Sequence, residues 1–283
     1  MNEIDAGKPI FILSCERSGS TLLRYIIDTH PDIACPGELV LGQFVRSLRV
    51  LLERTRGREA DAEDMAPGWV QREVHRTVQA RMTAYARARG KSRWAEKSPG
   101  NLEFLDELLW AFPDARFICL YRRSLDVVHS CLEISGDGFM PELAPYAARY
   151  PDNFIAAMLE SWATKTARML ALERSVACCR VHYEALVNDP VATLDRVFAF
   201  LGLDWDHGLL EGIFETPHDP GGGDFKIRSA KRIGSDRIGT GGSLNRNKLS
   251  AVPAVLQRQC TELHLELGYP PWSGLGILPD GRS

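Results

Sequence analysis

The sequence lacks long apolar runs and a positively charged leader. No stretch reaches the roughly 18 apolar residues that a membrane-spanning helix needs. The N-terminus, MNEIDAGKPIFILSC, has too short an apolar run for a signal peptide. We therefore expect a cytoplasmic protein with no membrane partner. The formal net charge is -3 over 283 residues, which argues against nucleic acid as a partner.

Cysteine pairs with C-x-x-C spacing are also missing. The chain has seven cysteines, an odd number, and most lie in apolar runs. This pattern is typical of buried, reduced thiols rather than of a disulfide framework. The seven histidines are scattered without the spacing of metal ligands, so we expect no metal site.

Short apolar runs alternate with amphipathic segments along the chain. Residues 9–15, 93–97, 115–121 and 176–183 are predicted strands, and 33–35 is a candidate fifth. Near-continuous apolarity suits a parallel sheet covered on both faces. We therefore predict an α/β, P-loop-like three-layer fold with a mostly parallel central sheet flanked by helices. It forms a single domain over residues 1–283, with helical elements at about 39–90 and 153–174.

One late segment, residues 218–247, has many glycines and basic residues and few core-forming residues. Its composition fits a surface loop. A long basic, glycine-rich loop in a compact domain is also a usual form of active-site lid.

The segment FILSCERSGSTLL begins as a phosphate-binding loop but lacks its lysine. A strand, a turn at Gly19 and a helix opening with Ser20 and Thr21 form an anion site, because the first N–H groups of a helix lack partners. The pattern G-x-x-x-x-G-K-[ST] is only half matched, with Ser14 in place of the first glycine and Ser20 in place of the lysine.

The acidic residue of an ATP–Mg²⁺ site is missing as well. Such a site needs a carboxylate at the end of a core strand. The strand ARFICLY instead ends in Arg122 and Arg123, which repel a metal ion and attract a phosphate ester. The sequence therefore favours a nucleotide bound without metal.

Three blocks of the sequence together resemble one family. FILSCERSGSTLLRYIIDTHPDIACPGE resembles the 5′-phosphosulfate segment of sulfotransferases that use 3′-phosphoadenosine-5′-phosphosulfate (PAPS). FPDARFICLYRRSLDVVHS resembles their 3′-phosphate segment, and YEALVNDPVATLDRVFAFLGL resembles the segment after the adenine-facing strand. The order of the blocks matches the family, and the resemblance is nearest to its bacterial and tyrosylprotein-type branch.

The resemblance implies a donor site made of the phosphate loop and residues from later blocks. Arg17 would contact the 5′-phosphosulfate, and Arg122 with Ser130 would bind the 3′-phosphate. Tyr183 would contact the adenine. The remaining loop contacts implied are Ser18, Gly19, Ser20, Thr21 and Leu22.

Glu38 is the candidate general base. If residues 33–35 form a parallel strand, the following PGE returns Glu38 to the edge of the sheet that carries Arg17. The tyrosylprotein-type branch has its catalytic glutamate at this offset. The alternative is a solvated glutamate at the start of a helix near Leu39. Because the cytosolic branch uses a histidine, His182 and His218 also stay candidates.

Other catalytic roles rest on the resemblance. Lys97, before Ser98-Pro99, matches a family lysine near the sulfuryl group, and Ser229 matches a serine that assists there. Related sequences often place Gly-Arg or Ser-Lys before a tryptophan in the late loop. This chain has RIGTGGSLN instead, so within 226–246 both Lys231 and Arg237 are candidates for binding the 3′-phosphate.

The predicted enzyme is a PAPS-dependent sulfotransferase that acts on a hydroxyl group by in-line transfer without metal. The alternatives are a divergent P-loop kinase using ATP and a non-catalytic adenine-nucleotide-binding module. The acceptor is expected to be a small molecule, and a homodimer is left open. Residues expected to line its pocket are Phe139, Tyr146, Tyr150 and Phe154.

Overall fold

A five-stranded parallel sheet forms the centre of the protein. The computed structural model describes residues 7–56, 66–135, 141–221, 227 and 230–272. The strands are β1 (Ile10–Ser14), β2 (Ile33–Ala34), β3 (Arg93–Lys97), β4 (Arg116–Tyr121) and β5 (Cys178–His182). Their order is β2-β3-β1-β4-β5, and each neighbouring pair is parallel. The predicted strands are confirmed, including the short run at 33–35.

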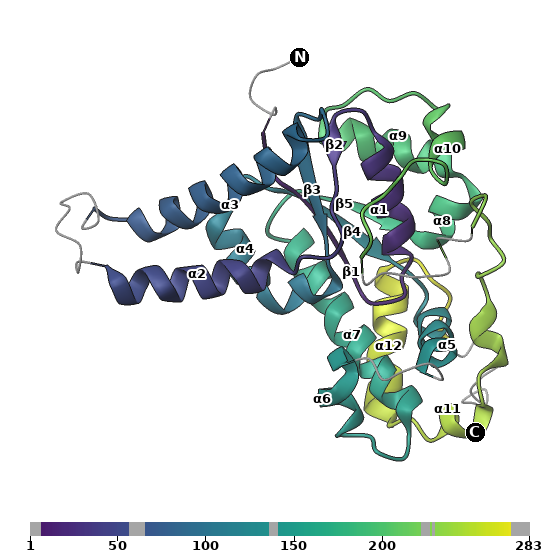
Figure 1. The fold of residues 1–283 in the computed structure, drawn as a ribbon. Helices are drawn as coiled ribbons and strands as arrows, with labels where there is room; N and C mark the ends of the chain where they lie inside the picture. Colours follow the sequence, from purple (N-terminus) through teal and green to yellow (C-terminus); the bar gives the residue numbers. More distant parts are fainter. Residues whose placement is uncertain (1–6, 57–65, 136–140, 222–226, 228–229, 273–283) are drawn as a thin grey trace.

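Helices cover both faces of the sheet (Figure 1). One face packs against α1 (Ser20–Thr29), α8 (Tyr183–Asn188), α9 (Pro190–Leu201) and α10 (Leu209–Gly212). The other packs against α3 (Trp69–Arg87), α4 (Leu105–Ala111), α5 (Ser124–Ser135), α7 (Phe154–Glu173) and α12 (Ala254–Glu266). The predicted three-layer α/β fold is confirmed.

The side chains of β1 point alternately to the two faces of the sheet and so into two separate apolar clusters. Phe11 and Leu13 point into one apolar cluster, and Ile10 and Ile12 point into the other. Successive side chains of a strand face opposite sides of a sheet, so a strand with helices on both sides must be apolar throughout. All five residues of β1 are accordingly buried.

The remaining elements complete the fold. They are α2 (Leu41–Thr55), α6 (Ala144–Ala147), α11 (Arg246–Ser250) and the 3₁₀ turns η2 (Pro99–Phe104), η3 (Pro141–Leu143) and η5 (Thr240–Ser243). In Figure 1, α2 and α3 project side by side away from the sheet. None of the helices in the described ranges is both long and apolar enough to cross a membrane.

The seven cysteines all lie within the described residues, and all are free thiols. Six are buried and Cys178 is partly buried. Burial, followed by the charge of Glu16, raises the pKa of the Cys15 thiol well above its usual value. Cys15 is therefore a core thiol beside the phosphate loop rather than a reactive thiolate.

Candidate active site

The predicted site residues lie in a row along the carboxyl edge of the sheet. Glu38 follows β2, Lys97 ends β3, Arg17 follows β1, Arg122 follows β4 and Tyr183 follows β5. Because the strand order is β2-β3-β1-β4-β5, this is also the order of the residues across the edge. Ligands of open α/β sheets bind beyond this edge, so the topology itself brings the candidate residues together.

The phosphate loop is held in a left-handed conformation before α1. Gly19 has φ 89° and Arg17 has φ 62°. A Cβ atom on Gly19 would lie 2.3 Å from Cδ2 of Tyr183, so only glycine fits between the loop and this ring. The turn directs the first N–H groups of α1 toward the edge of the sheet, where they form an anion site.

The hydroxyl groups of the loop suit a phosphate ligand. Ser18 is 1% exposed, and its Oγ has no hydrogen-bond partner among the described residues. Ser20 and Thr21 are also buried at the start of α1. A buried hydroxyl usually has a partner, so the Ser18 hydroxyl beside a helix N-terminus fits an oxygen-rich anion. Leu22 packs in the core, which leaves only its backbone N–H for such a ligand.

Arg17, Ser130 and Arg122 converge beside the loop. Arg17 Nε donates to Ser130 Oγ at 3.2 Å. Arg122 donates from Nη1 to the Arg17 carbonyl oxygen and from Nη2 to the Arg237 carbonyl oxygen, both at 2.7 Å. Its guanidinium carbon lies 4.4 Å from the centre of the Tyr183 ring. The structure thus brings together residues predicted to bind the two phosphates and the adenine.

Glu38 and Lys97 form an ion pair at the other end of the row. Lys97 Nζ donates to Glu38 Oε1, and their side chains are 1% and 24% exposed, respectively. The N-cap of α2 is Val40, which has no side-chain cap. Glu38 therefore faces Lys97 instead of capping the helix. Glu38 keeps some access to solvent beside this cation, as a general base needs.

Residues at the end of β3 and directly after it hold the chain that follows Glu38. Leu39 N donates to Glu96 Oε1 at 3.1 Å, Val40 N to Ser98 Oγ at 3.0 Å and Gly42 N to Asn101 Oδ1 at 3.0 Å. Burial raises the pKa of the Glu96 carboxyl, although its hydrogen bonds oppose this. No motif in the sequence marks Glu96, Ser98 or Asn101 as supports of the site, and none of the three was predicted.

Neither candidate histidine is placed to serve as the base. His182 ends β5, at the opposite edge of the sheet from β2, about 19 Å away at about 4.8 Å per strand. Burial lowers its pKa. The His218 side chain is 3% exposed, with Nδ1 2.6 Å from Asp28 Oδ2 and Nε2 2.9 Å from the Ile213 carbonyl oxygen. Both of its nitrogens already have partners, so His218 is not placed to accept a substrate proton.

One candidate from the late loop, Arg237, meets the cluster through its backbone. Arg237 meets Arg122 through its carbonyl oxygen, while its side chain pairs with Glu133 at 3.0 Å. Lys231 is exposed. Ser229 lies outside the described residues, so its role stays a prediction, as does the lid.

The expected acceptor-pocket residues are partly accounted for. Tyr146 is buried at 8% exposure, and Tyr150 and Phe154 pack against the same core cluster. Phe139 lies outside the described residues. These aromatic rings therefore support the fold around α7, and their contact with an acceptor stays a prediction.

A buried ion pair beneath the loop was not predicted. Lys165 of α7 donates to Glu16, and their side chains are 2% and 7% exposed. Glu16 directly precedes Arg17, so this pair anchors the loop to the helix layer. The helical spacing of the sequence could have indicated that Lys165 is buried, because it puts Lys165 on the same face of α7 as Trp162 and Met169. Both of these side chains are 1% exposed.

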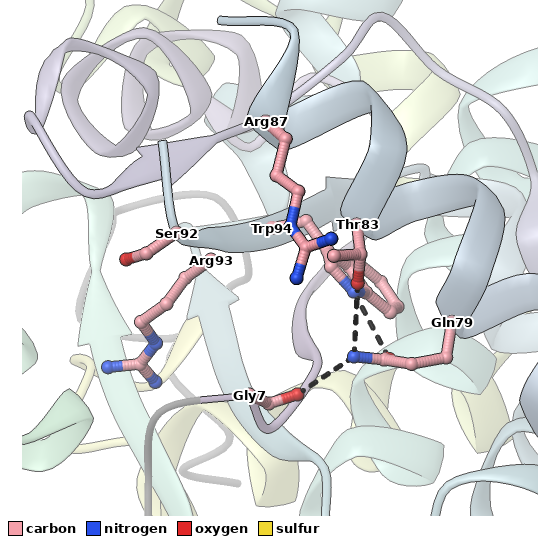
Figure 2. Close-up of a pocket in the computed structure, with 7 residues that line it drawn as sticks. All are labelled: Gly7, Gln79, Thr83, Arg87, Ser92, Arg93 and Trp94. Atoms are coloured by element: carbon pink, nitrogen blue, oxygen red, sulfur yellow. Dashed lines mark hydrogen bonds between the residues drawn. The ribbon is translucent and has the colours of Figure 1, made fainter. Parts of the chain in front are cut away.

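A cavity of about 440 Å³ lies elsewhere (Figure 2). It is lined by Gly7, Gln79, Thr83, Arg87, Ser92, Arg93 and Trp94. Arg93 begins β3 and Gly7 precedes β1, so this cavity is at the amino edge of the sheet, opposite the predicted site. Within the described residues, no three histidine, cysteine, aspartate or glutamate side chains are grouped so as to hold a metal ion.

A parallel sheet with a phosphate loop and a cationic carboxyl edge defines a P-loop-like nucleotide-binding protein. The particular family follows from comparison with known proteins. Residues 9–207 match the model of the sulfotransferase family. The chain belongs to this family, which confirms the predicted enzyme class, a PAPS-dependent sulfotransferase.

Curated relatives and solved structures agree with this assignment. Protein-tyrosine sulfotransferase 1 of Danio rerio is 30% identical over 71% of this chain and 55% of its own length. Nodulation protein NoeE of Sinorhizobium fredii is 28% identical over 74% of this chain and 53% of its own length. The chain thus spans about half the length of these relatives.

The fold has a solved counterpart in a sulfotransferase domain. The sulfotransferase domain of the Synechococcus PCC 7002 olefin synthase is 27% identical, with a TM-score of 0.67 over 94% of this chain and 96% of that chain. The sulfotransferase domain from the curacin biosynthetic pathway has a TM-score of 0.64 at 19% identity and shows the same fold.

Proposed function

We propose that the protein transfers a sulfuryl group from PAPS to the hydroxyl group of a small-molecule acceptor, with Glu38 as the general base. The observation that carries this proposal is the row of Glu38, Lys97, Arg17, Arg122 and Tyr183 along the edge of the sheet. The row has a proton acceptor at one end and a nucleotide-binding group at the other, with cationic side chains between them.

The donor-binding half of the row fits the parts of PAPS. The N–H groups of α1, with Ser18, Ser20 and Thr21, bind the 5′-phosphate end. Arg122 and Ser130 bind the 3′-phosphate, and Tyr183 packs against the adenine. Charge-assisted contacts of this kind position a phosphate firmly, and positioning supplies a large part of catalysis in group transfer.

The remaining residues act on the reacting group. Glu38 takes the proton of the acceptor hydroxyl while the oxygen of that hydroxyl forms a bond to sulfur. The bond between sulfur and the 5′-phosphate oxygen breaks, and adenosine 3′,5′-bisphosphate leaves with the electron pair. Arg17 and Lys97 stabilise the negative charge that develops on the sulfuryl group and the leaving oxygen. Glu38 afterwards releases its proton to solvent.

The acceptor side borders an apolar surface. Leu39, directly after Glu38, is 46% exposed, and Phe44 on α2 is 49% exposed. We therefore favour acceptors that carry an apolar group beside the hydroxyl. We also propose a cytoplasmic location, because seven free cysteines fit a reducing compartment. Fractionation of cells that express the tagged chain tests this location.

Incubation with sulfur-labelled PAPS and a panel of alcohols, phenols and sugars tests the function. We expect a sulfated product with at least one hydroxyl compound and release of adenosine 3′,5′-bisphosphate. Turnover of ATP that stops with EDTA would instead support the kinase alternative. Tight binding of adenosine 3′,5′-bisphosphate without product from any acceptor would support the non-catalytic module.

Replacement of Glu38 by glutamine tests the base. The amide keeps the shape of the side chain but cannot accept the proton, so Glu38→Gln is expected to lower kcat by about 10²-fold or more. The affinity for adenosine 3′,5′-bisphosphate, measured by calorimetry, is expected to stay within about twofold, since Glu38 lies at the far end of the row. Near wild-type turnover would show that another group is the base.

A further inference from the structure

Two buried side chains of α1 hold the segment that leads to Glu38. Arg24 and Asp28, one helical turn apart, are 3% and 6% exposed. Arg24 Nη1 donates to the Cys35 carbonyl oxygen at 3.2 Å, and Asp28 Oδ1 accepts from Cys35 N at 2.7 Å. Both backbone polar groups of Cys35 are therefore fixed to α1, three residues before Glu38. We call residues 35–38 the base segment.

The same two side chains also hold residues 218–221, which we call the strap. Asp28 Oδ2 lies 2.6 Å from Nδ1 of His218, and Arg24 Nη2 donates to the Asp219 carbonyl oxygen at 3.1 Å. The His218 ring stacks on Tyr25, with ring centres 4.0 Å apart. Arg24 and Asp28 thus each contact both segments, so neither segment can move without breaking contacts to α1.

A second anchor ties the strap to the C-terminal end of α3 and the turn after it. The Asp219 carboxylate accepts hydrogen bonds from Tyr85 Oη at 2.8 Å and from Arg89 Nη2 at 2.7 Å. Burial alone would raise the pKa of the Asp219 carboxyl, but the hydrogen bonds from Tyr85 and Arg89 outweigh it and lower this pKa. The strap is therefore fixed on two helices.

The strap and the base segment touch through glycines. A Cβ atom on Gly37 would lie 2.5 Å from the Pro220 carbonyl oxygen, and one on Gly221 would lie 3.1 Å from Gly37 Cα and 3.3 Å from Glu38 N. Such distances leave no room for a side chain at Gly37. The backbone of the strap thus packs directly against the residue that precedes the candidate base.

We infer that Arg24, Asp28 and His218 are positioning residues for Glu38, acting through the strap and the base segment. The N-terminus of α1 is the proposed donor site, and Arg24 lies about 6 Å along the same helix at about 1.5 Å per residue. One rigid helix therefore sets the place of both the donor and the base. This inference rests on the proposed function, in which Glu38 takes the acceptor proton.

A double-mutant cycle separates positioning from general support of the fold. Asp28→Asn removes the negative charge that faces His218, which is expected to loosen the strap and the base segment. A general base that is displaced by about 1 Å loses about 10²-fold in rate. We expect Asp28→Asn to lower kcat by about this factor, with 2-phenylethanol and labelled PAPS as substrates. In a Glu38→Gln background the same change is expected to alter kcat by less than about twofold, because no base remains to be positioned.

A control variant and a second test variant distinguish a displaced base from a general loss of folding. Asp195→Asn makes the same substitution at an exposed aspartate, which lies 3.4 Å from His207 and accepts a hydrogen bond from Trp205, and is expected to leave kcat unchanged. Gly221→Ala alters no charge, and its methyl group is expected to displace the base segment, whereas Gly242→Ala adds a methyl group where no atom lies within 4 Å. Only the first alanine is expected to lower kcat.

The measured kcat values distinguish positioning of Glu38 from general stabilisation of the fold. Equal losses from Asp28→Asn in the wild-type and Glu38→Gln backgrounds would overturn positioning and assign Asp28 to general stability. Wild-type kcat in both Asp28→Asn and Gly221→Ala would overturn it as well. If Glu38→Gln itself keeps full turnover, the proposed base fails first, and that failure is recognised without the strap variants. Affinity for adenosine 3′,5′-bisphosphate, measured for every variant, is expected to stay within about twofold.

Discussion

Arg122 illustrates how a single side chain can both bind a ligand and shape the site. Its two Nη atoms hold the carbonyl oxygens of Arg17 and Arg237, so it joins the phosphate loop to the late loop. Its Nε is buried without a hydrogen-bond partner among the described residues. A planar guanidinium has several donors in a fixed geometry and can serve protein and phosphate together.

Loss of Arg122 is expected to weaken binding of adenosine 3′,5′-bisphosphate. Arg122→Ala removes a charge-assisted contact worth about 2 kcal/mol, which corresponds to about a 30-fold higher Kd in calorimetry. Arg123→Ala is the matched control, because the Arg123 guanidinium lies toward the Tyr269 ring at 6.0 Å. An unchanged Kd for Arg122→Ala would remove this residue from the proposed 3′-phosphate site.

The sequence predicted residues that line the site, but it did not predict the residues that hold them in place. Arg17, Glu38, Lys97 and Arg122 were found because motifs or strand ends mark them. Arg24 and Asp28 were missed, because their partners at Cys35, His218 and Asp219 lie in other parts of the chain. A side chain that binds distant backbone leaves no local pattern in a sequence.

Among the elements, α7 connects the helix layer to the phosphate loop. Its buried face carries Lys165, which meets Glu16 of the loop. Burial alone would lower the pKa of Lys165, but the charge and hydrogen bond of Glu16, together with smaller effects of Cys15 and Glu103, outweigh burial and raise this pKa. The helix therefore fixes the loop through a charged pair as well as through apolar packing.

Breaking this pair on one side is expected to destabilise the fold. Lys165→Met leaves the Glu16 carboxylate buried without its cation, and such a change typically costs about 3–5 kcal/mol. The double variant Glu16→Gln, Lys165→Met is expected to recover most of this loss, since no unpaired charge remains. Urea unfolding of the two variants measures the difference, and equal stability of both would contradict the account.

Element prediction succeeded where the local pattern was strong. β3 was predicted with its exact ends, and β1 and β4 within one residue of each end, because continuous apolar runs between polar segments are distinctive. The short helix α8 and the late helix α12 were not predicted. α8 has only six residues, too few to show a helical period.

For the whole molecule, the order of the strands determines the site. The chain makes β1, β2, β3, β4 and β5 in sequence, but the sheet arranges them as β2-β3-β1-β4-β5. This order places Lys97 between Glu38 and Arg17, although Lys97 comes far later in the chain. The sequence predicted that the strands would be parallel, but strand order depends on packing between distant elements and was not predicted.

In the proposed complex, adenosine 3′,5′-bisphosphate and the sulfuryl group lie along this row. A crystal structure of the protein with adenosine 3′,5′-bisphosphate would show whether they do. We expect the 5′-phosphate at the N-terminus of α1, beside residues 17–21, and the 3′-phosphate within hydrogen-bonding distance of Arg122 and Ser130. A nucleotide bound at the amino edge of the sheet, in the cavity of Figure 2, would contradict the account.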